Sequence, residues 1–242
     1  MHLHVDLPHL GAGQLAMLAR RVLGLVTTRE TVRRILLRRH ALVVELEDAR
    51  QRRRRRIHVK RKLALWGADF TLVWVLGFFP LWLLGVIDYQ GSRLVALERV
   101  AAPTASELSR VVCAAIAKHG TPSRLLTDNG GAFVSKDFAA FLEQRGVAHS
   151  FIRPGHAWTN GRIERVFRTF KETVFGFIWL FSSTAQVERF AADFLQWHNR
   201  DRPHSSWGGR TPDEVWFGRK LLVRPRARVS YFDGHLHWWR FG

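Results

Sequence analysis

The chain has 242 residues, of which 47% are hydrophobic and 24% are charged, so it can bury the core of one domain of ordinary size. Its formal net charge of +18 indicates a polyanionic partner, and nucleic acid is the first candidate. The only cysteine is Cys113, which excludes an intramolecular disulfide and a cysteine-rich zinc site.

Residues 14–39 predict two short helices with a break at Gly24. Thr27 or Thr28 can cap the second helix, which has apolar residues on one side and arginines on the other. The pair is typical of a helix-turn-helix, in which a basic helix enters the major groove of DNA. The alternative is an amphipathic helix pair with a solvated basic face. The arginines predicted to bind DNA are Arg29, Arg33 and Arg34.

A strongly basic stretch follows, from Ala49 to Lys62. Such a dense run of like charges cannot fold on its own, which predicts a linker. Basic side chains that neutralise phosphates release counterions, so we expect the linker to bind DNA without reading its sequence and to lose affinity as salt rises. Its five consecutive arginines are Arg52, Arg53, Arg54, Arg55 and Arg56.

The most apolar run, residues 72–87, is interrupted by Pro80. A membrane-spanning helix usually needs about 20 apolar residues, and this run is shorter. The run therefore predicts two buried strands joined by a turn near residues 77–80, and no membrane association.

The first of these strands carries an acid. Alternation along residues 65–75 places Asp69, Thr71 and Val73 on one face. A carboxylate in an otherwise apolar strand is costly to bury without a partner, and a metal ion would supply one. Asp88, at the end of the next strand, is the rival candidate for this role.

Strands and helices alternate further along the chain. The predicted strands are 81–89, 93–100, 124–127 and 147–152, and the predicted helices are 103–119 and 135–145. The first three strands of the core form a meander, whereas the later strands need crossover connections. This order predicts a mixed sheet with helices on its faces.

Two further acids flank the last part of this region. Asp128 ends a short apolar strand and precedes a glycine-rich turn, and Glu164 lies in the first turn of a helix that Asn160 is predicted to cap. The two acids have 164 − 128 − 1 = 35 residues between them. Arg168 and Lys171 follow Glu164 by four and seven residues, so all three share one helix face.

The motifs WGADFT, TDNG and NGRIERVFRTFK, followed by an Arg-Pro-His segment, resemble the catalytic core of DDE transposases and retroviral-type integrases. The resemblance covers roughly residues 60–220. Since the chain has no N-terminal His/Cys zinc module, it is similar to the bacterial insertion-sequence branch. The resemblance implies a ribonuclease H-like fold in which strands one and four are neighbours. It further implies that Asp69, Asp128 and Glu164 are catalytic and hold two Mg²⁺ ions, with Mn²⁺ as an alternative.

The function that this resemblance implies is metal-dependent cleavage of DNA ends and strand transfer during transposition. The expected partners are double-stranded DNA, as transposon ends and as target, and a second copy of the chain, because pairing two ends requires at least a dimer. Arg168 and Lys171 would contact phosphates, or else belong to a solvated helix face. The expected location is the bacterial cytoplasm, at the nucleoid. Two alternatives stay open: a ribonuclease H-like nuclease for another nucleic acid, and a non-catalytic DNA-binding regulator of transposition.

We expect an α/β fold, a ribonuclease H-like mixed five-stranded sheet flanked by helices, with a small N-terminal helix-turn-helix and a short C-terminal β appendage. The four predicted parts are a helix-turn-helix-like DNA-binding segment (1–48), a basic linker (49–62), the catalytic core (63–220) and a β-hairpin tail (221–242). Asp233–Gly234 is predicted as the two-residue turn of that hairpin.

Overall fold

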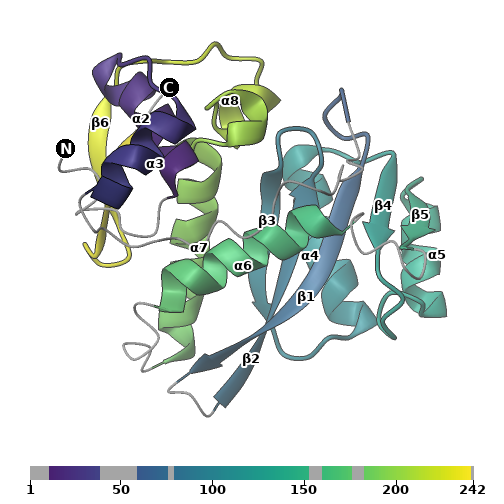
Figure 1. Cartoon of the computed structure of the whole chain (residues 1–242). Helices are drawn as coiled ribbons and strands as arrows, with labels where there is room; N and C mark the ends of the chain where they lie inside the picture. Colours follow the sequence, from purple (N-terminus) through teal and green to yellow (C-terminus); the bar gives the residue numbers. More distant parts are fainter. Residues whose placement is uncertain (1–10, 39–58, 76–78, 153–159, 176–182, 241–242) are drawn as a thin grey trace. The chain divides into compact units, whose positions relative to one another are not determined.

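The computed structural model of the chain describes residues 11–38, 59–75, 79–152, 160–175 and 183–240 (Figure 1). The chain forms two compact units. One joins residues 1–54 with residues 199–242, and the other consists of residues 55–198. The predicted basic linker arginines Arg52 to Arg56 lie outside the described residues. The predicted division into four parts stays a prediction.

The larger unit is built on a five-stranded sheet with the order β3-β2-β1-β4-β5. Its strands are β1 (Trp66–Val75), β2 (Phe79–Asp88), β3 (Arg93–Val100), β4 (Arg124–Thr127) and β5 (Ala148–Phe151). The first three strands pair antiparallel, and β4 pairs parallel with both β1 and β5. The prediction of a mixed sheet, with strands one and four as neighbours, is confirmed.

One face of this sheet is covered by α4 (Ala105–His119) and α5 (Lys136–Gln144). The core on this side contains Ala68 and Leu84 from the strands, together with the apolar faces of both helices. Each helix begins at a hydroxyl cap: Thr104 accepts a hydrogen bond from the Glu107 backbone N–H, and Ser135 accepts one from that of Phe138. Each helix therefore buries the stripe of apolar residues that the sequence pattern predicts.

The opposite face is covered by α6 (Gly161–Phe175), which lies across β1 and β2 (Figure 1). Close approach is possible because β2 carries Gly85, where a Cβ atom would lie 2.7 Å from the Phe167 ring. The next helix, α7 (Thr184–Arg200), packs on α6 through Phe170, whose ring makes edge contacts with Phe190 and Phe194.

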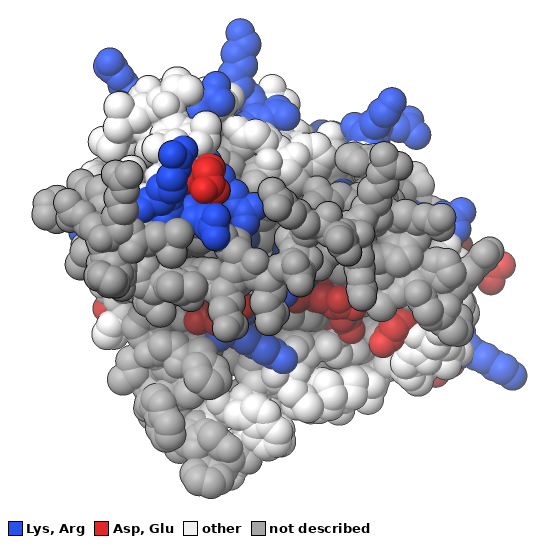
Figure 2. Space-filling view, viewed as in Figure 1, with Lys and Arg blue, Asp and Glu red and all other residues white. Residues whose placement is uncertain are grey.

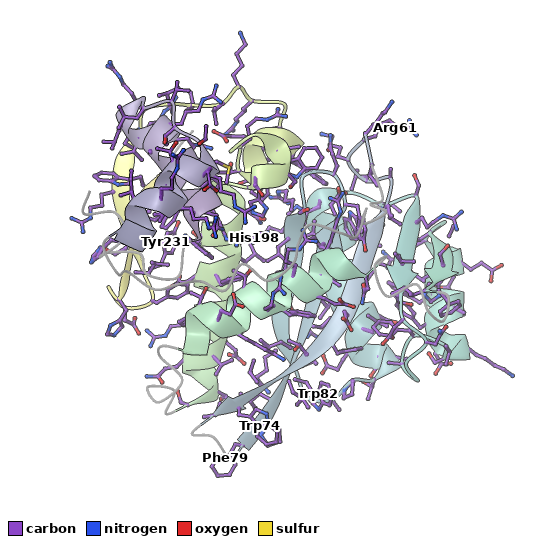
Figure 3. All side chains as sticks on the ribbon, in the orientation of Figure 1. Arg61, Trp74, Phe79, Trp82, His198 and Tyr231 are labelled. Atoms are coloured by element: carbon purple, nitrogen blue, oxygen red, sulfur yellow. The ribbon has the colours of Figure 1, made fainter. Side chains whose placement is uncertain are left out.

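The described residues of the apolar run, 72–75 and 79–87, fall in β1 and β2, as predicted, whereas residues 76–78 lie outside the described residues. None of the described helices has the length and hydropathy of a membrane span. Near the end of the β1–β2 hairpin, Trp74 and Phe79 are exposed, whereas Trp82 is half-buried against the Phe70 ring (Figure 3). The exposed rings mark where this pair of strands extends beyond the covering helices.

The smaller unit joins the two ends of the chain. Its elements are α2 (Ala12–Leu23), α3 (Arg29–Arg38), η3 (Ser205–Trp207), α8 (Pro212–Trp216), β6 (Ala227–Tyr231) and β7 (Leu236–Arg240). The prediction of a short helix pair near the N-terminus and a β appendage near the C-terminus is confirmed. Residues 199–220, which the sequence places in the catalytic core, here cluster with the N-terminal helices.

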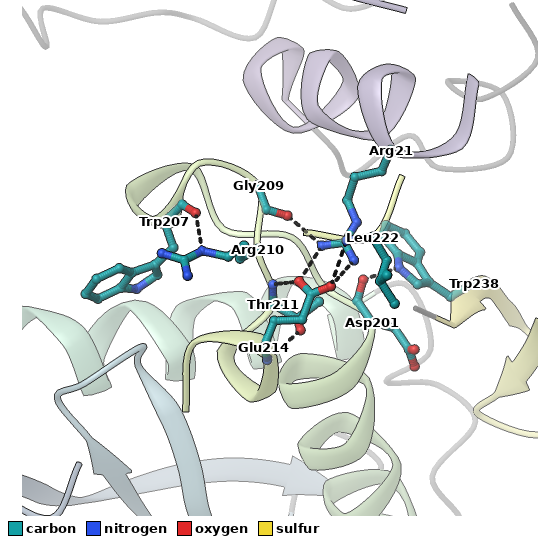
Figure 4. A network of polar contacts seen from close by, with 9 residues as sticks. All are labelled: Arg21, Asp201, Trp207, Gly209, Arg210, Thr211, Glu214, Leu222 and Trp238. Carbon is teal, nitrogen blue, oxygen red and sulfur yellow. Dashed lines mark hydrogen bonds and ion pairs between the residues drawn. The ribbon is translucent and has the colours of Figure 1, made fainter. Parts of the chain in front are cut away.

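A buried ion pair connects these ends (Figure 4). The Arg21 guanidinium on α2 donates to both carboxylate oxygens of Glu214 on α8, at 2.6 and 2.8 Å, and also to the Gly209 carbonyl. The Glu214 carboxylate also accepts hydrogen bonds from the backbone N–H groups of Thr211 and Leu222. The two charged side chains are only 1% and 2% exposed, so the charge of the Glu214 carboxylate is compensated by these protein donors.

The C-terminal hairpin turns at the predicted residues, although the last paired residues of its strands are Tyr231 and Leu236. Inside this pair the His235 backbone N–H donates to the Phe232 carbonyl at 3.0 Å, so Asp233 and Gly234 are the central residues of the turn. Phe232 is buried and, like Asp233, takes a positive φ. The hairpin is fixed to Asp201, just after α7, by two donors: the Tyr231 hydroxyl donates to the Asp201 carboxylate, and the Trp238 indole N–H donates to the Asp201 carbonyl.

Candidate functional site

The first predicted acid, Asp69, lies in the central strand of the sheet. Its strand partner is Gly85 on β2, and its side chain points to the face that α6 covers. On the other side, Gly67 is aligned with Leu126 of the parallel strand β4. Asp69 and Asp128 each follow these aligned residues by two positions, so neighbouring parallel strands carry the two acids toward the same edge.

Asp128 follows the last residue of β4 and shapes the turn after it. Its Oδ1 atom accepts the Gly130 backbone N–H at 2.9 Å. A Cβ atom at Gly130 would lie 3.1 Å from the same oxygen, so the missing side chain leaves room for this turn. The amide of Asn129 donates to the Ile152 carbonyl at 3.1 Å, which fixes the turn to the end of β5. Asp128 itself is exposed.

Glu164 is exposed in the first turn of α6, where the helix dipole favours a negative charge. It shares a cavity of about 650 Å³ with Asp69. The cavity is lined by Asp69, Phe70, Thr71, Glu164, Phe167, Arg168, Lys171 and Glu172. Strand β1 and helix α6 therefore bring two of the three predicted acids to one cavity.

The electrostatics of Asp69 connect it to both other acids. Burial, together with the nearby charges of Asp128 and Glu164, raises the pKa of Asp69 to about 7. Hydrogen bonds from Phe70 and Asn160 oppose this rise in pKa. Asp128, which does not line the cavity, is thus linked to it by its effect on the Asp69 carboxylate.

Both oxygens of Asp69 are held by donors. The Phe70 backbone N–H reaches Oδ1 at 2.8 Å, and the Asn160 side-chain amide reaches Oδ2 at 3.1 Å. The sequence predicts Asn160 as a helix cap, yet its side chain bonds to an acid 91 positions earlier. Sequence reasoning missed this contact because local sequence around the start of α6 carries no information about which strand lies beside it.

The rival acid, Asp88, has a structural role. It is fully buried at the end of β2 and accepts hydrogen bonds from the backbone N–H groups of Leu63 and Gln90 and from the Trp66 indole N–H. Burial raises the pKa of Asp88 to about 6 despite these donors. Its oxygens tie the entry into β1 to the exit from β2, so it is not free to act in the cavity.

The predicted DNA-binding side chains are placed in different parts of the chain. Arg168 and Lys171 are exposed on α6 and line the cavity with Asp69 and Glu164. The Arg168 Nε atom lies 4.0 Å from the Glu172 carboxylate, a weak surface pair. On α3, Arg29 and Arg34 are exposed, and the partly buried Arg33 lies 3.6 Å from Glu30. Figure 2 shows acidic side chains with a basic side chain beside them.

The donor chemistry of the cavity fits a hard divalent cation, since carboxylate oxygens are the ligands such ions prefer. Burial and repulsion from Asp128 and Glu164 raise the pKa of Asp69, and a bound cation would relieve this repulsion. Within the described residues, however, no three His, Cys, Asp or Glu side chains are close enough together to form a metal site. The three carboxylates therefore interact electrostatically, but they do not surround one common point.

Arg162 and His198 do not line the cavity but contact the turn between β2 and β3. Arg162, at the start of α6, donates to the Ser92 hydroxyl at 3.0 Å and lies over the Tyr89 ring. The buried His198 ring places Nε2 3.0 Å from the Ser92 carbonyl. Both contacts converge on the turn between β2 and β3, so they anchor α6 and α7 to the sheet.

Parts of the chain are similar in sequence to proteins of mobile elements and retroviruses. The uncharacterized 39.2 kDa protein of insertion element IS476 from Xanthomonas euvesicatoria is 38% identical over 93 residues, which are 38% of this chain and 27% of that protein. The Gag-Pol polyprotein of Rous sarcoma virus (strain Prague) is 30% identical over 112 residues, 46% of this chain and 7% of the polyprotein. The matched segments thus span a minor part of these relatives.

Solved integrase structures share the fold. The catalytic core domain of HTLV-2 integrase, determined in complex with magnesium in a dimeric form, matches with a TM-score of 0.54 at 20% identity, over 64% of this chain and 97% of that one. A chain of the simian T-cell lymphotropic virus intasome, in complex with PP2A regulatory subunit B56 gamma, matches with a TM-score of 0.58 at 22% identity, over 94% of this chain and 78% of that one.

Two family models, both described as integrase core domain, match residues 59–157 and 145–212. Together they span the described sheet, the helices on both of its faces and all three predicted acids. The chain belongs to the integrase core domain family.

Proposed function

We propose that the chain is a DDE-type DNA transposase that cleaves DNA ends and joins them to a target strand. The observation that carries the proposal is the coupling of three acids: Asp69 shares a cavity with Glu164, and the charges of both Asp128 and Glu164 help to raise its pKa. The similarity to an insertion-element protein supports transposition as the biological setting.

Asp69, Asp128 and Glu164 are the residues that would hold Mg²⁺, as two ions, or Mn²⁺ in its place. Two divalent ions, when bound, relieve the charge on the phosphate and activate the attacking oxygen. The structurally similar HTLV-2 integrase core was determined in complex with magnesium, which supports this choice of ion. Phe70 and Asn160 keep the Asp69 oxygens in place, since each donates to a different one.

The chemistry consists of two phosphoryl transfers. Water attacks the phosphodiester at the element end, the bond from phosphorus to the 3′ oxygen breaks, and that oxygen leaves as a 3′-hydroxyl. The freed hydroxyl then attacks a phosphodiester of the target, which forms one phosphodiester and breaks another. Arg168 and Lys171, on the helix face beside Glu164, would contact the phosphates and position the DNA backbone.

DNA binding outside the cavity is assigned to the basic residues of the N-terminal region. Arg29, Arg33 and Arg34 on α3 would contact an element end, and the arginines from Arg52 to Arg56 would follow the phosphates without sequence preference. Two element ends require at least two copies of the chain. The dimeric form of the HTLV-2 core and the intasome chain support an oligomer on DNA. The nucleoid of a bacterial cytoplasm is the proposed location.

A strand-transfer assay tests this proposal. The protein is incubated with Mg²⁺ and DNA that carries the ends of its element, and products are resolved by size. We expect joined products that disappear with Glu164→Gln and persist with Glu143→Gln, which removes the same charge from the exposed surface of α5. Cleavage without joining would favour a nuclease for another nucleic acid. A gel shift with neither reaction would favour the non-catalytic regulator.

A further inference from the structure

Asn160 is a buried polar side chain that contacts one of the acids lining the cavity. It is 5% exposed, it immediately precedes α6, and its backbone carbonyl accepts the Glu164 N–H at 3.2 Å. Its side-chain amide donates to Asp69 Oδ2 at 3.1 Å. One residue therefore contacts the backbone of one predicted acid and the side chain of another.

The direction of the side-chain contact follows from chemistry. A carboxylate only accepts hydrogen bonds, so the atom of Asn160 that faces ionised Asp69 has to be the NH₂ group. This leaves Oδ1 as a buried acceptor, and it has no hydrogen-bond partner in the described part of the chain. Buried acceptors without a protein partner are usually satisfied by ordered water. Asn160 thus keeps an unused acceptor beside an acid that lines the cavity.

We propose that Asn160 is a positioning residue for the metal-binding carboxylate of Asp69, and that it sets the affinity of the site for divalent cations. The inference rests on the proposed function of the three acids. Its amide fixes the orientation of Oδ2 without neutralising the charge of Asp69, and its backbone couples that orientation to the first turn of α6, which carries Glu164. Hydrogen bonds that orient a metal ligand typically change metal affinity by about 10–100-fold when removed.

The test measures Mn²⁺ binding by the full-length protein without DNA, by calorimetry and by electron paramagnetic resonance of free Mn²⁺. Asn160→Leu keeps the approximate volume and removes the amide. We expect its dissociation constant for Mn²⁺ to rise roughly tenfold or more. Asn160→Gln retains an amide on a longer stem and is expected to recover part of the affinity.

Asn199→Leu is the matched control, because Asn199 is also a buried asparagine but belongs to the smaller unit. Its Mn²⁺ affinity should equal that of the wild type. Wild-type Mn²⁺ affinity in Asn160→Leu would overturn the inference, and so would an equal loss in Asn199→Leu. A different result would contradict the proposed function alone: the wild type fails to join DNA, while its Mn²⁺ affinity exceeds that of Asn160→Leu by the expected factor.

Discussion

At the scale of single residues, three of the described aspartates, Asp69, Asp88 and Asp201, are largely removed from solvent but have different surroundings. Asp69 borders a cavity, and burial together with the charges of Asp128 and Glu164 raises its pKa. Asp88 is enclosed by three donors, and Asp201 accepts the Tyr231 hydroxyl while its Oδ1 has no partner within the described residues. Burial alone therefore does not distinguish these carboxylates, whereas their hydrogen-bond partners and neighbouring charges do.

The raised pKa values of Asp88 and Asp201 make the stability of the protein depend on pH. Burial raises the folded-state pKa of each to about 6, above the ordinary value of 3.8. Their contribution to the free energy of unfolding is therefore fully present below pH 3.8 and lost as pH rises through 6. Asp201→Asn, which keeps an acceptor for Tyr231 and carries no charge, should flatten this decline in urea unfolding experiments at pH 4–7.

Asp88→Asn should behave differently at the same pH values. An amide cannot accept from all three donors, so one buried donor loses its partner and the free energy of unfolding falls by about 1–3 kcal/mol. Equal and stabilising effects of the two substitutions would contradict these assignments.

At the scale of elements, the position of α6 on the sheet decides whether Glu164 reaches the cavity. The helix approaches β2 at Gly85, where any side chain would meet Phe167 and Ile163. The Asn160 amide and the Arg162 guanidinium hold its first turn against β1 and the β2–β3 turn. The helix is thus fixed at its start by polar contacts and along its length by a close apolar approach.

Gly85→Ala tests the close approach. Its new methyl group would lie 2.7 Å from the Phe167 ring, so either the ring or α6 has to move. We expect a loss of about 1–3 kcal/mol in the free energy of unfolding, measured by denaturant titration. Adding Phe167→Leu should restore part of the loss. If the two substitutions are simply additive, the two side chains do not share this space.

At the scale of the whole molecule, two compact units are formed by a chain that starts and ends in the same unit. Arg21 and Glu214 are 193 positions apart and form a buried pair there. Helix α2 therefore depends on residues that lie far later in the sequence. Removal of one partner of such a buried ion pair strongly destabilises the protein, because the other charge is left buried without compensation.

Glu214→Gln is the direct test of this connection. The substitution leaves the Arg21 guanidinium buried without a counter-charge, and we expect the smaller unit to lose about 3–5 kcal/mol of stability. Hydrogen exchange should show faster opening of α2 and of the Thr211–Leu222 segment. Exchange that accelerates only around α8 would show that the two ends fold independently.

Much of the larger unit could be predicted from local pattern. The alternation around Asp69, the caps at Thr104 and Ser135, and the turn after Asp128 each depend on neighbours a few positions away. The Asn160–Asp69 and Arg21–Glu214 contacts join residues 91 and 193 positions apart, so only the folded arrangement reveals them. The turn at Asp233–Gly234 also follows from local sequence, whereas the burial of Phe232 beside it does not.

The most direct measurement is a crystal structure of the protein soaked in Mn²⁺, with the anomalous signal used to locate the ion. We predict a Mn²⁺ peak bonded to the Asp69 carboxylate and to at least one of Asp128 and Glu164, and no such peak in Asp69→Asn. A fully occupied Mn²⁺ site elsewhere with none at Asp69, or a structure in which the three carboxylates stay apart at saturating Mn²⁺, would contradict the proposal that these acids form one catalytic centre.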